Sequence, residues 1–225
     1  MGGGLGAKPL YGLRKGNKMI YRFANLLVLI FFVLSSQIIF SQWKVGLQGG
    51  VNISTYDLKN KAEFAEISSK TGLVIGGIVV YSIDDQLEIN SGLRYIIKGA
   101  HIVIDEVGFQ VDNKLNFNFL EIPLHLKYLF VNSSFKPFIS AGIDLSYLAL
   151  AKGEGTVNGN PIEDDITEQL DKFELSLDGG LGLEYEADNN ISYILSSNYS
   201  YSLVKVDQDL TNRGLQILFS VLYKF

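Results

Sequence analysis

Regular alternation of apolar and polar residues is the feature of this sequence that most restricts its fold. Between residues 173 and 186, one set of alternate positions is apolar apart from a glycine, whereas the other set is charged, polar or glycine. Successive side chains of a β-strand point to opposite faces, so this segment forms a strand with one apolar and one polar face. Residues 191–203 repeat the pattern with tyrosine and leucine opposite serine and asparagine.

The same pattern predicts eight strands, joined by short and long connections in turn. Short links at 83–86, 131–134 and 187–190 carry the turn-forming residues Asp, Asn and Ser. Longer links fall at 54–70, 101–115, 151–172 and 204–212. This is the plan of an all-β, eight-stranded antiparallel up-and-down transmembrane β-barrel, with both ends of the barrel domain at the periplasmic side. The predicted strands cover residues 42–53, 71–82, 87–100, 116–130, 135–150, 173–186, 191–203 and 213–225.

The first 41 residues are interpreted as an N-terminal extension and signal peptide, followed by a barrel domain over residues 42–225. Arg14, Lys15, Lys18 and Arg22 precede an uncharged, strongly apolar stretch from Phe23 to Phe40. A basic segment, an apolar segment and a small residue before the mature chain are typical of a secretory signal, with cleavage expected after Ser41. Met19 is an alternative start, and a membrane-anchor helix is the alternative to a signal peptide.

Composition removes several classes of function. The chain has 225 residues and no Cys, which excludes disulfides, Cys-bound zinc, iron–sulfur clusters and thiol nucleophiles. Five of the 19 basic residues and none of the 24 acidic ones precede residue 42, which leaves 14 basic residues and a formal charge of −10 for the barrel domain. So acidic a domain argues against nucleic acid as a partner.

The charged residues of the predicted strands share the polar face. Unpaired polar groups are costly in hydrocarbon, so we expect this face to line the lumen and the apolar face to contact outer-membrane lipid. Lys44, Lys136, Glu186 and Lys224 also fall on the inward face. With them, this face carries six basic and seven acidic residues, and this near-balance favours paired charges in a packed lumen. The predicted structural charge network consists of Glu88, Arg94, Lys98, Glu121, His125, Lys127, Asp144, Glu174, Asp178 and Glu184.

Aromatic residues gather near the predicted strand ends, as expected of the two interfacial girdles of a membrane barrel. Trp43, Tyr81 and Tyr185 represent the group at the short-turn side, and Tyr147 and Phe173 the group at the long-loop side. The last strand ends the chain on Phe225, as is common in outer-membrane proteins, where the terminal strand serves as the insertion signal.

Two strands depart from the simple pattern. Residues 71–82 are apolar on both faces, because Val74, Ile78 and Val80 occupy the side expected to be polar. In residues 116–130 we expect the alternation to break between Phe119 and Leu120, and Pro123, which cannot donate to a ladder, lies in mid-strand. A β-bulge near 119–123 is the expected explanation.

The segment from Phe119 to Tyr128, Phe-Leu-Glu-Ile-Pro-Leu-His-Leu-Lys-Tyr, resembles the Tyr-Leu-Glu-Ile-Pro-Leu signature of PorT-like outer-membrane β-barrel proteins. The segments 91–99, 136–142 and 178–184 follow in the same order, so that the resemblance covers nearly all of 42–225. Ile96 and Ile97 depart from the more polar pair common in that family. The resemblance implies an eight-stranded membrane barrel; a few such proteins support secretion, but most have no established activity.

Motifs for catalysis or cofactor binding are weak, so no catalytic residue, metal site or cofactor is predicted. Ser133 and Lys136 match Ser-x-x-Lys but fall in a turn, and Gly180-Leu-Gly182 lacks the third glycine and the helix of a dinucleotide site. His125 is interpreted as a structural residue rather than part of a hydrolase site, and His101 as a solvated loop residue. The acidic residues of 151–172, including Glu163 and Asp165, suit a solvated loop better than a site for cations that bridge lipopolysaccharide phosphates.

The sequence therefore predicts a non-enzymatic integral protein of the cell outer membrane, with a structural or envelope-interaction role. The alternatives are a narrow channel for small solutes or ions and, second, a soluble lipocalin-like ligand carrier, which would carry its apolar face inside. Expected partners are outer-membrane lipid, the barrel-assembly machinery during insertion and other envelope proteins. No nucleic-acid partner is expected.

Overall fold

The computed structural model describes residues 42–225 except 59–64, 107–108, 132, 189 and 205–209. The predicted N-terminal extension and signal peptide lie outside these residues. The described chain contains nine strands, the short 3-10 helix η1 (Thr167–Gln169) and no α-helix. No helix in these residues has the length and apolarity needed to cross a membrane. The strands are β1 (Trp43–Leu58), β2 (Ala65–Ser82), β3 (Leu87–Glu106), β4 (Phe109–Leu129), β5 (Phe135–Val157), β6 (Asn160–Asp165), β7 (Phe173–Glu186), β8 (Ile191–Val204) and β9 (Leu210–Lys224).

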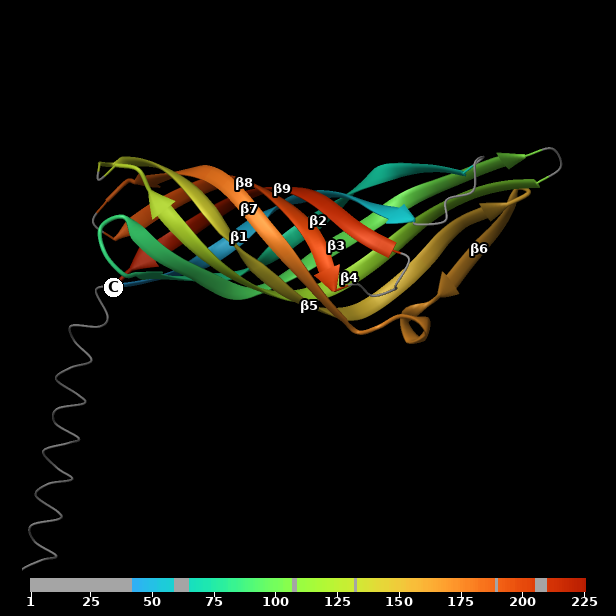
Figure 1. Cartoon of the computed structure of the whole chain (residues 1–225), viewed down its shortest axis with the longest axis horizontal. Coiled ribbons are helices and arrows are strands. Elements are labelled where there is room, and N and C mark those ends of the chain that lie inside the picture. The colour runs from blue at the N-terminus through green and yellow to red at the C-terminus, as the bar shows by residue number, and fades with distance from the viewer. Residues whose placement is uncertain (1–41, 59–64, 107–108, 132, 189, 205–209) are drawn as a thin grey trace, which may run out of the picture. The chain divides into compact units, whose positions relative to one another are not determined.

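Eight of these strands close into a ring, as the alternation predicts. Each pairs antiparallel with its neighbours in the order β4-β3-β2-β1-β9-β8-β7-β5, and pairing of β4 with β5 completes the circle. The first and last strands meet directly, with Lys44 opposite Lys224 and Leu58 opposite Leu210. The ring therefore has a turn end, with the short links, and a loop end. Figure 1 shows the closed barrel lying along its length.

The strand boundaries at the loop end differ from the prediction. β3 and β4 continue as one hairpin to the pair Glu106–Phe109, where a loop over 101–115 was expected. β5 runs on to Val157, and β6, which the sequence did not predict, folds back along it from Asn160 to Asp165. These segments carry polar residues on both faces, so the apolar alternation used to recognise strands is missing there. Beyond the barrel, β3 to β6 project as a twisted sheet, called here the loop-end extension (Figure 1).

The outer surface of the barrel is a band of exposed apolar side chains. Leu47, Leu93, Leu124, Leu181 and Phe219 are each at least half exposed, and further exposed Leu, Ile, Val, Phe and Tyr side chains lie around the barrel with them. Aromatic rings border the band in cross-strand or neighbouring pairs. At the turn end Phe135 stacks on Tyr185 with ring centroids 4.5 Å apart, and at the loop end Tyr147 meets Phe173 at 5.4 Å. This exterior suits lipid and does not fit the lipocalin-like alternative.

Buried apolar side chains occupy two levels inside the barrel. A larger cluster toward the loop end includes Tyr56, Phe117, Phe119 and Leu148. A smaller cluster toward the turn end includes Val80, Leu129 and Phe138. Val74, Ile78 and Val80 of β2, which are apolar on the inward face, belong to these clusters rather than to lipid.

The expected interruption of alternation in β4 is wrong. Phe117 and Phe119 both point inward, in phase with Glu121, His125 and Lys127, because they belong to the apolar cluster of the lumen. A register shift does occur at Asn118/Phe119 in the pairing with β5, but the extra residue is Ala149 of β5. Pro123 stays in register opposite Asp144, and its carbonyl accepts a hydrogen bond from the Ser91 hydroxyl at 2.9 Å.

Candidate functional site in the barrel lumen

All ten residues of the predicted charge network are buried inside the barrel, the most exposed being His125 at 6%. They come from β3, β4, β5 and β7, where every second residue faces the lumen. Lys44 of β1 and Lys136 of β5, also expected on the inward face, are buried with them. The ionic contacts divide these side chains into two groups at different depths.

The first group, called the lower cluster, lies toward the turn end and consists of Lys44, Glu88, Lys127 and Glu184. The Lys44 ammonium lies 2.8 Å from Glu88 and 2.6 Å from Glu184. The Lys127 ammonium contacts the other oxygens of the same two carboxylates, at 2.7 and 2.5 Å. Two cations alternate with two anions, so the cluster is formally neutral. Lys127 also lies over the ring of Phe138, with its ammonium 4.7 Å from the centroid.

The second group, called the upper cluster, consists of Arg94, Lys98, Glu121, Asp144, Glu174, His125 and Asp178. Arg94 contacts Glu121 at 2.6 Å and Asp144 at 3.2 Å. Lys98 contacts Glu121 at 2.8 Å and Glu174 at 2.7 Å. Ser146 also donates a hydrogen bond to Glu121 at 2.6 Å. Two permanent cations thus face four carboxylates.

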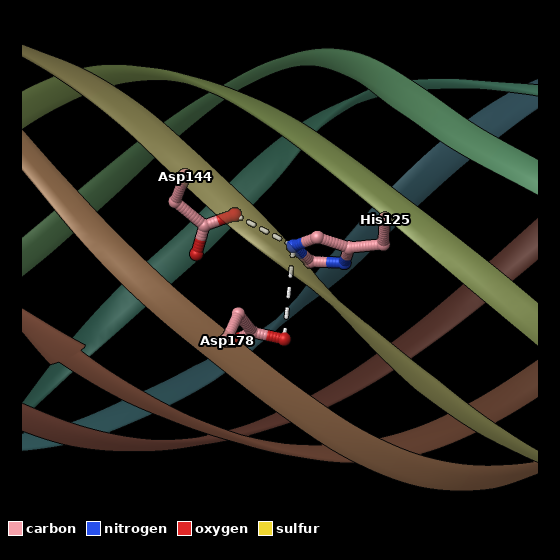
Figure 2. A group of neighbouring side chains, drawn as sticks. All are labelled: His125, Asp144 and Asp178. Atoms are coloured by element: carbon pink, nitrogen blue, oxygen red, sulfur yellow. Dashed lines mark hydrogen bonds and ion pairs between the residues drawn. The ribbon is translucent and has the colours of Figure 1, made fainter.

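His125 joins the upper cluster through two aspartates from neighbouring strands (Figure 2). Its Nε2 lies 2.7 Å from Asp144 Oδ1 and 3.6 Å from Asp178 Oδ1. Asp178 Oδ1 accepts a hydrogen bond from the Asn198 amide at 2.8 Å. Asp178 Oδ2 and Asn198 Oδ1 are buried without a hydrogen-bond partner in the described part of the chain.

A small cavity of about 40 Å³ lies beside this group. Arg94, His125 and Asn198 line it together with Phe138 and several serines. The space is enough for at least one water molecule. Toward the loop end, the apolar cluster around Phe117 and Phe119 follows directly, with Lys98 4.9 Å from the centroid of the Phe119 ring.

The other residues considered as candidates have ordinary structural partners. The Ser133 hydroxyl donates to its neighbour Phe135 O at 2.6 Å, whereas Lys136 pairs with Glu186, so the two do not form a catalytic pair. Gly180 leaves room for Asn198, whose side chain lies 2.8 Å from where a Cβ would stand. His101 lies in β3 and not in a loop, and it contacts Asp112 of β4 at 2.7 Å.

The acidic residues of 151–172 are held by individual contacts in the loop-end extension. Glu163 pairs with Lys152 at 2.7 Å and Glu168 with Lys172 at 3.1 Å. Hydrogen bonds from the Thr167 side chain and backbone lower the pKa of Asp165 below its ordinary value. Among the residues that the structure describes, the group with metal-ligand geometry is not here but at His125, Asp144 and Asp178.

Sequence reasoning missed several uncharged polar residues of the lumen. Asn52, Asn198 and Gln216 are almost fully buried, and each has an oxygen without a hydrogen-bond partner in the described residues. Their positions follow the same inward alternation as the charged residues, so that signal was available. Only the charged residues were included in the predicted network.

Comparison with known proteins identifies the class of this barrel. Residues 35–208 match the family model described as the outer membrane protein beta-barrel domain. No curated protein matches the chain.

Solved structures of similar fold cover about four fifths of this chain. OprG from Pseudomonas aeruginosa is 14% identical with a TM-score of 0.50, covering 82% of this chain and 96% of that one. Neisserial surface protein A is 17% identical with a TM-score of 0.47, covering 82% and 98%. The attachment invasion locus protein Ail of Yersinia pestis is 13% identical with a TM-score of 0.42, covering 82% and 99%. The closed ring of eight strands, its apolar exterior and the family match lead to one conclusion: the chain belongs to the outer membrane protein beta-barrel domain family and is a protein of the outer membrane.

Proposed function

We propose that this protein is a closed, non-catalytic barrel that anchors an interaction surface in the outer membrane. The observation that carries this proposal is the filled lumen. Two ionic clusters and two apolar clusters span its interior, and the cavity between them holds about 40 Å³. Paired charges from strands on different sides of the ring support a lumen that is closed to general solute flow.

Planar-bilayer recording tests the closed lumen. We expect no large, stable conductance from the purified barrel, because opening a path would separate several buried ion pairs. A variant with Lys98, Phe117 and Phe119 replaced by alanine serves as the control, since it removes both an ion-pairing group and the aromatic layer. A stable wild-type conductance equal to that of this variant would refute the proposal.

A narrow channel is the second candidate, and one observation favours it. The lumen-facing side of β8 is rich in hydroxyl groups, with Ser192, Ser196, Ser200 and Ser202 all buried. Such a stripe can hydrogen-bond to a file of water. Conductance that is small, selective and reduced by replacing Ser196 and Ser200 with valine would support this alternative.

The loop-end extension is the proposed interaction surface. Its strands continue well past the aromatic girdle, and Asp112, Glu163 and Asp164 are exposed on it. We infer that it contacts other envelope components, whereas the turn end carries only short links. A photocrosslinking residue at Glu163 is expected to capture neighbours in intact cells. The matched position is Asp85, which is exposed in the β2–β3 turn, and crosslinks from Asp85 alone would contradict this assignment.

Two finer assignments are part of the proposal. The segment from Phe119 to Tyr128 supports a place among PorT-like barrels within the broader family. The aromatic end of β9 supports insertion by the barrel-assembly machinery, because Tyr223 and Phe225 are both exposed at the turn end. Deletion of Phe225 is expected to reduce the amount of assembled barrel in the outer membrane without changing the amount synthesised.

A further inference from the structure

The geometry around Gly142 brings three potential metal ligands together. Gly142 of β5 pairs with His125 of β4 on one side and with Asp178 of β7 on the other. A Cβ at position 142 would stand 2.7 Å from the His125 ring, so only glycine lets the imidazole lie across the strand. Asp144, two residues farther along β5, points to the same face. His125, Asp144 and Asp178 each offer a ligand atom, all within 4.8 Å of one another (Figure 2).

The charge balance of the upper cluster leaves room for a divalent cation. Arg94 and Lys98 supply two positive charges, whereas Glu121, Asp144, Glu174 and Asp178 supply four negative ones. With His125 neutral, the cluster carries a formal charge of −2, although all seven residues are buried. The lower cluster is neutral by the same count. Uncompensated buried charge is costly, and a doubly charged ion would remove it.

Unsatisfied polar atoms point to the same place. Asp178 Oδ2 and the Asn198 oxygen have no hydrogen-bond partner among the described residues, and both side chains are more than nine-tenths buried. Buried polar atoms are rarely left without a partner. The adjacent cavity, lined by His125 and Asn198, can hold a water molecule as a further ligand.

We propose that His125 Nε2 and the carboxylates of Asp144 and Asp178 bind one divalent first-row transition-metal ion inside the lumen. One imidazole and two carboxylates form a donor set suited to Zn²⁺ and its neighbours rather than to Ca²⁺ or Mg²⁺. Tetrahedral zinc places its ligand atoms about 3.4 Å apart. The observed separations of 2.7 and 3.6 Å from His125 Nε2 bracket that value, and all three ligand atoms lie within 4.8 Å of one another.

The positive charge of Arg94 lies on the side of Asp144 that faces away from the proposed metal position. Its guanidinium contacts Asp144 Oδ2, whereas His125 faces Oδ1, so that one oxygen of this carboxylate stays directed at the metal position. An outer partner of this kind fixes the orientation of a metal-binding carboxylate. The competing occupant is a pair of protons, one on His125 and one on an aspartate, which would neutralise the cluster without any metal.

Titration of the metal-free barrel with Zn²⁺ tests the proposal. The full barrel is folded in detergent in metal-free buffer and titrated with Zn²⁺ by calorimetry. A parallel titration with Co²⁺ is followed by the visible absorption bands of that ion. We expect one ion per chain for the wild type. His125→Gln and Asp178→Asn should each weaken binding by more than about tenfold, in line with the loss of a ligand.

The second histidine provides the matched control. His101 also contacts an aspartate, Asp112, but at the exposed surface of the extension, so His101→Gln should bind Zn²⁺ like the wild type. Heat-modifiable migration on gels shows whether each variant is folded. If His125→Gln is not folded, Asp178→Asn still tests the site, because it retains the shape of the side chain. Absence of stoichiometric binding by the wild type, as two protons would produce, overturns the proposal. Binding that is lost in His101→Gln or unchanged in Asp178→Asn also overturns it.

Discussion

Leu181 and Glu184 lie three residues apart in β7 and face opposite environments. Leu181 is 64% exposed in the apolar band, whereas Glu184 is fully buried between Lys44 and Lys127. A single strand therefore has to satisfy lipid on one face and a buried ionic cluster on the other. Substitutions at the two positions test different forces.

Leu181→Arg is expected to reduce the free energy of unfolding by about 2–4 kcal/mol, the cost of an arginine at the bilayer midplane. Leu203, which is exposed beyond Tyr201 at the loop end of β8, offers a control of the same chemistry. Leu203→Arg should cost less than about 1 kcal/mol, because it lies near the interface. Urea unfolding in lipid vesicles measures both values, and equal losses at the two positions would contradict the membrane placement.

Lys127→Met should destabilise the barrel by about 3–5 kcal/mol, because Glu88 and Glu184 would share only Lys44. Adding Glu184→Gln removes the surplus negative charge and should recover part of the loss. The same urea unfolding assay gives the coupling between the two substitutions. If the double variant is as unstable as the sum of the single variants, the two side chains do not act as a pair.

The inward position of each charged residue could be predicted from alternation, but its partner could not. Lys44 pairs with Glu184 across 140 residues of sequence, and this contact depends on the stagger of strands around the ring. The approach of His125 to Asp178 depends in turn on the missing side chain of Gly142 between them. Neither the stagger nor such a gap is written in the alternation of one strand.

At the scale of strands, some glycines lie where a neighbouring strand leaves no room for a side chain. Gly182 of β7 faces the ring of Phe138 on β5, and a Cβ there would stand 2.5 Å from both Phe138 Cζ and the Leu195 carbonyl oxygen. Gly179, in the same strand, faces the outside, and a Cβ there would meet nothing within 4 Å. The two glycines therefore have different reasons to be present.

Gly182→Ala should destabilise the barrel by about 1–3 kcal/mol, because the added methyl overpacks the lumen. Gly179→Ala should change stability by less than about 0.5 kcal/mol. The temperature at which each variant loses its folded, heat-modifiable form on gels ranks the stability of the two variants. A greater loss for Gly179→Ala would mean that the inward and outward faces of β7 are exchanged.

Strand boundaries were predictable where lipid imposes a pattern and not beyond it. The links at 83–86, 131–134 and 187–190 fall between strands as expected. β6 and the outer parts of β3, β4 and β5 lie beyond the girdles, where side chains on both faces contact water and polar neighbours. These segments are held together by backbone hydrogen bonds between strands, and they lack the contrast between an apolar and a polar face that the barrel strands have.

The described chain consists of a membrane barrel and the loop-end extension, and we expect the hairpins of the extension to be dispensable for the barrel. Replacing residues 103–112 with Asn-Gly would join Ile102 to its partner Asn113 through a tight turn. We expect this variant to reach the outer membrane, resist carbonate extraction and retain heat-modifiable migration, while losing the proposed outer interactions that the β3–β4 hairpin makes. Failure to assemble would show that the extension is needed for the barrel to form.

The pairing of Lys44 on β1 with Glu184 on β7 has a consequence for how the barrel assembles. These strands meet across the lumen only after β8 and β9 have closed the wall between β7 and β1. Until that moment Lys44, Glu88, Lys127 and Glu184 can form only an open chain of ion pairs. Closure of the strand ring and closure of this ring of charges therefore coincide, and we expect the last step of folding to be cooperative.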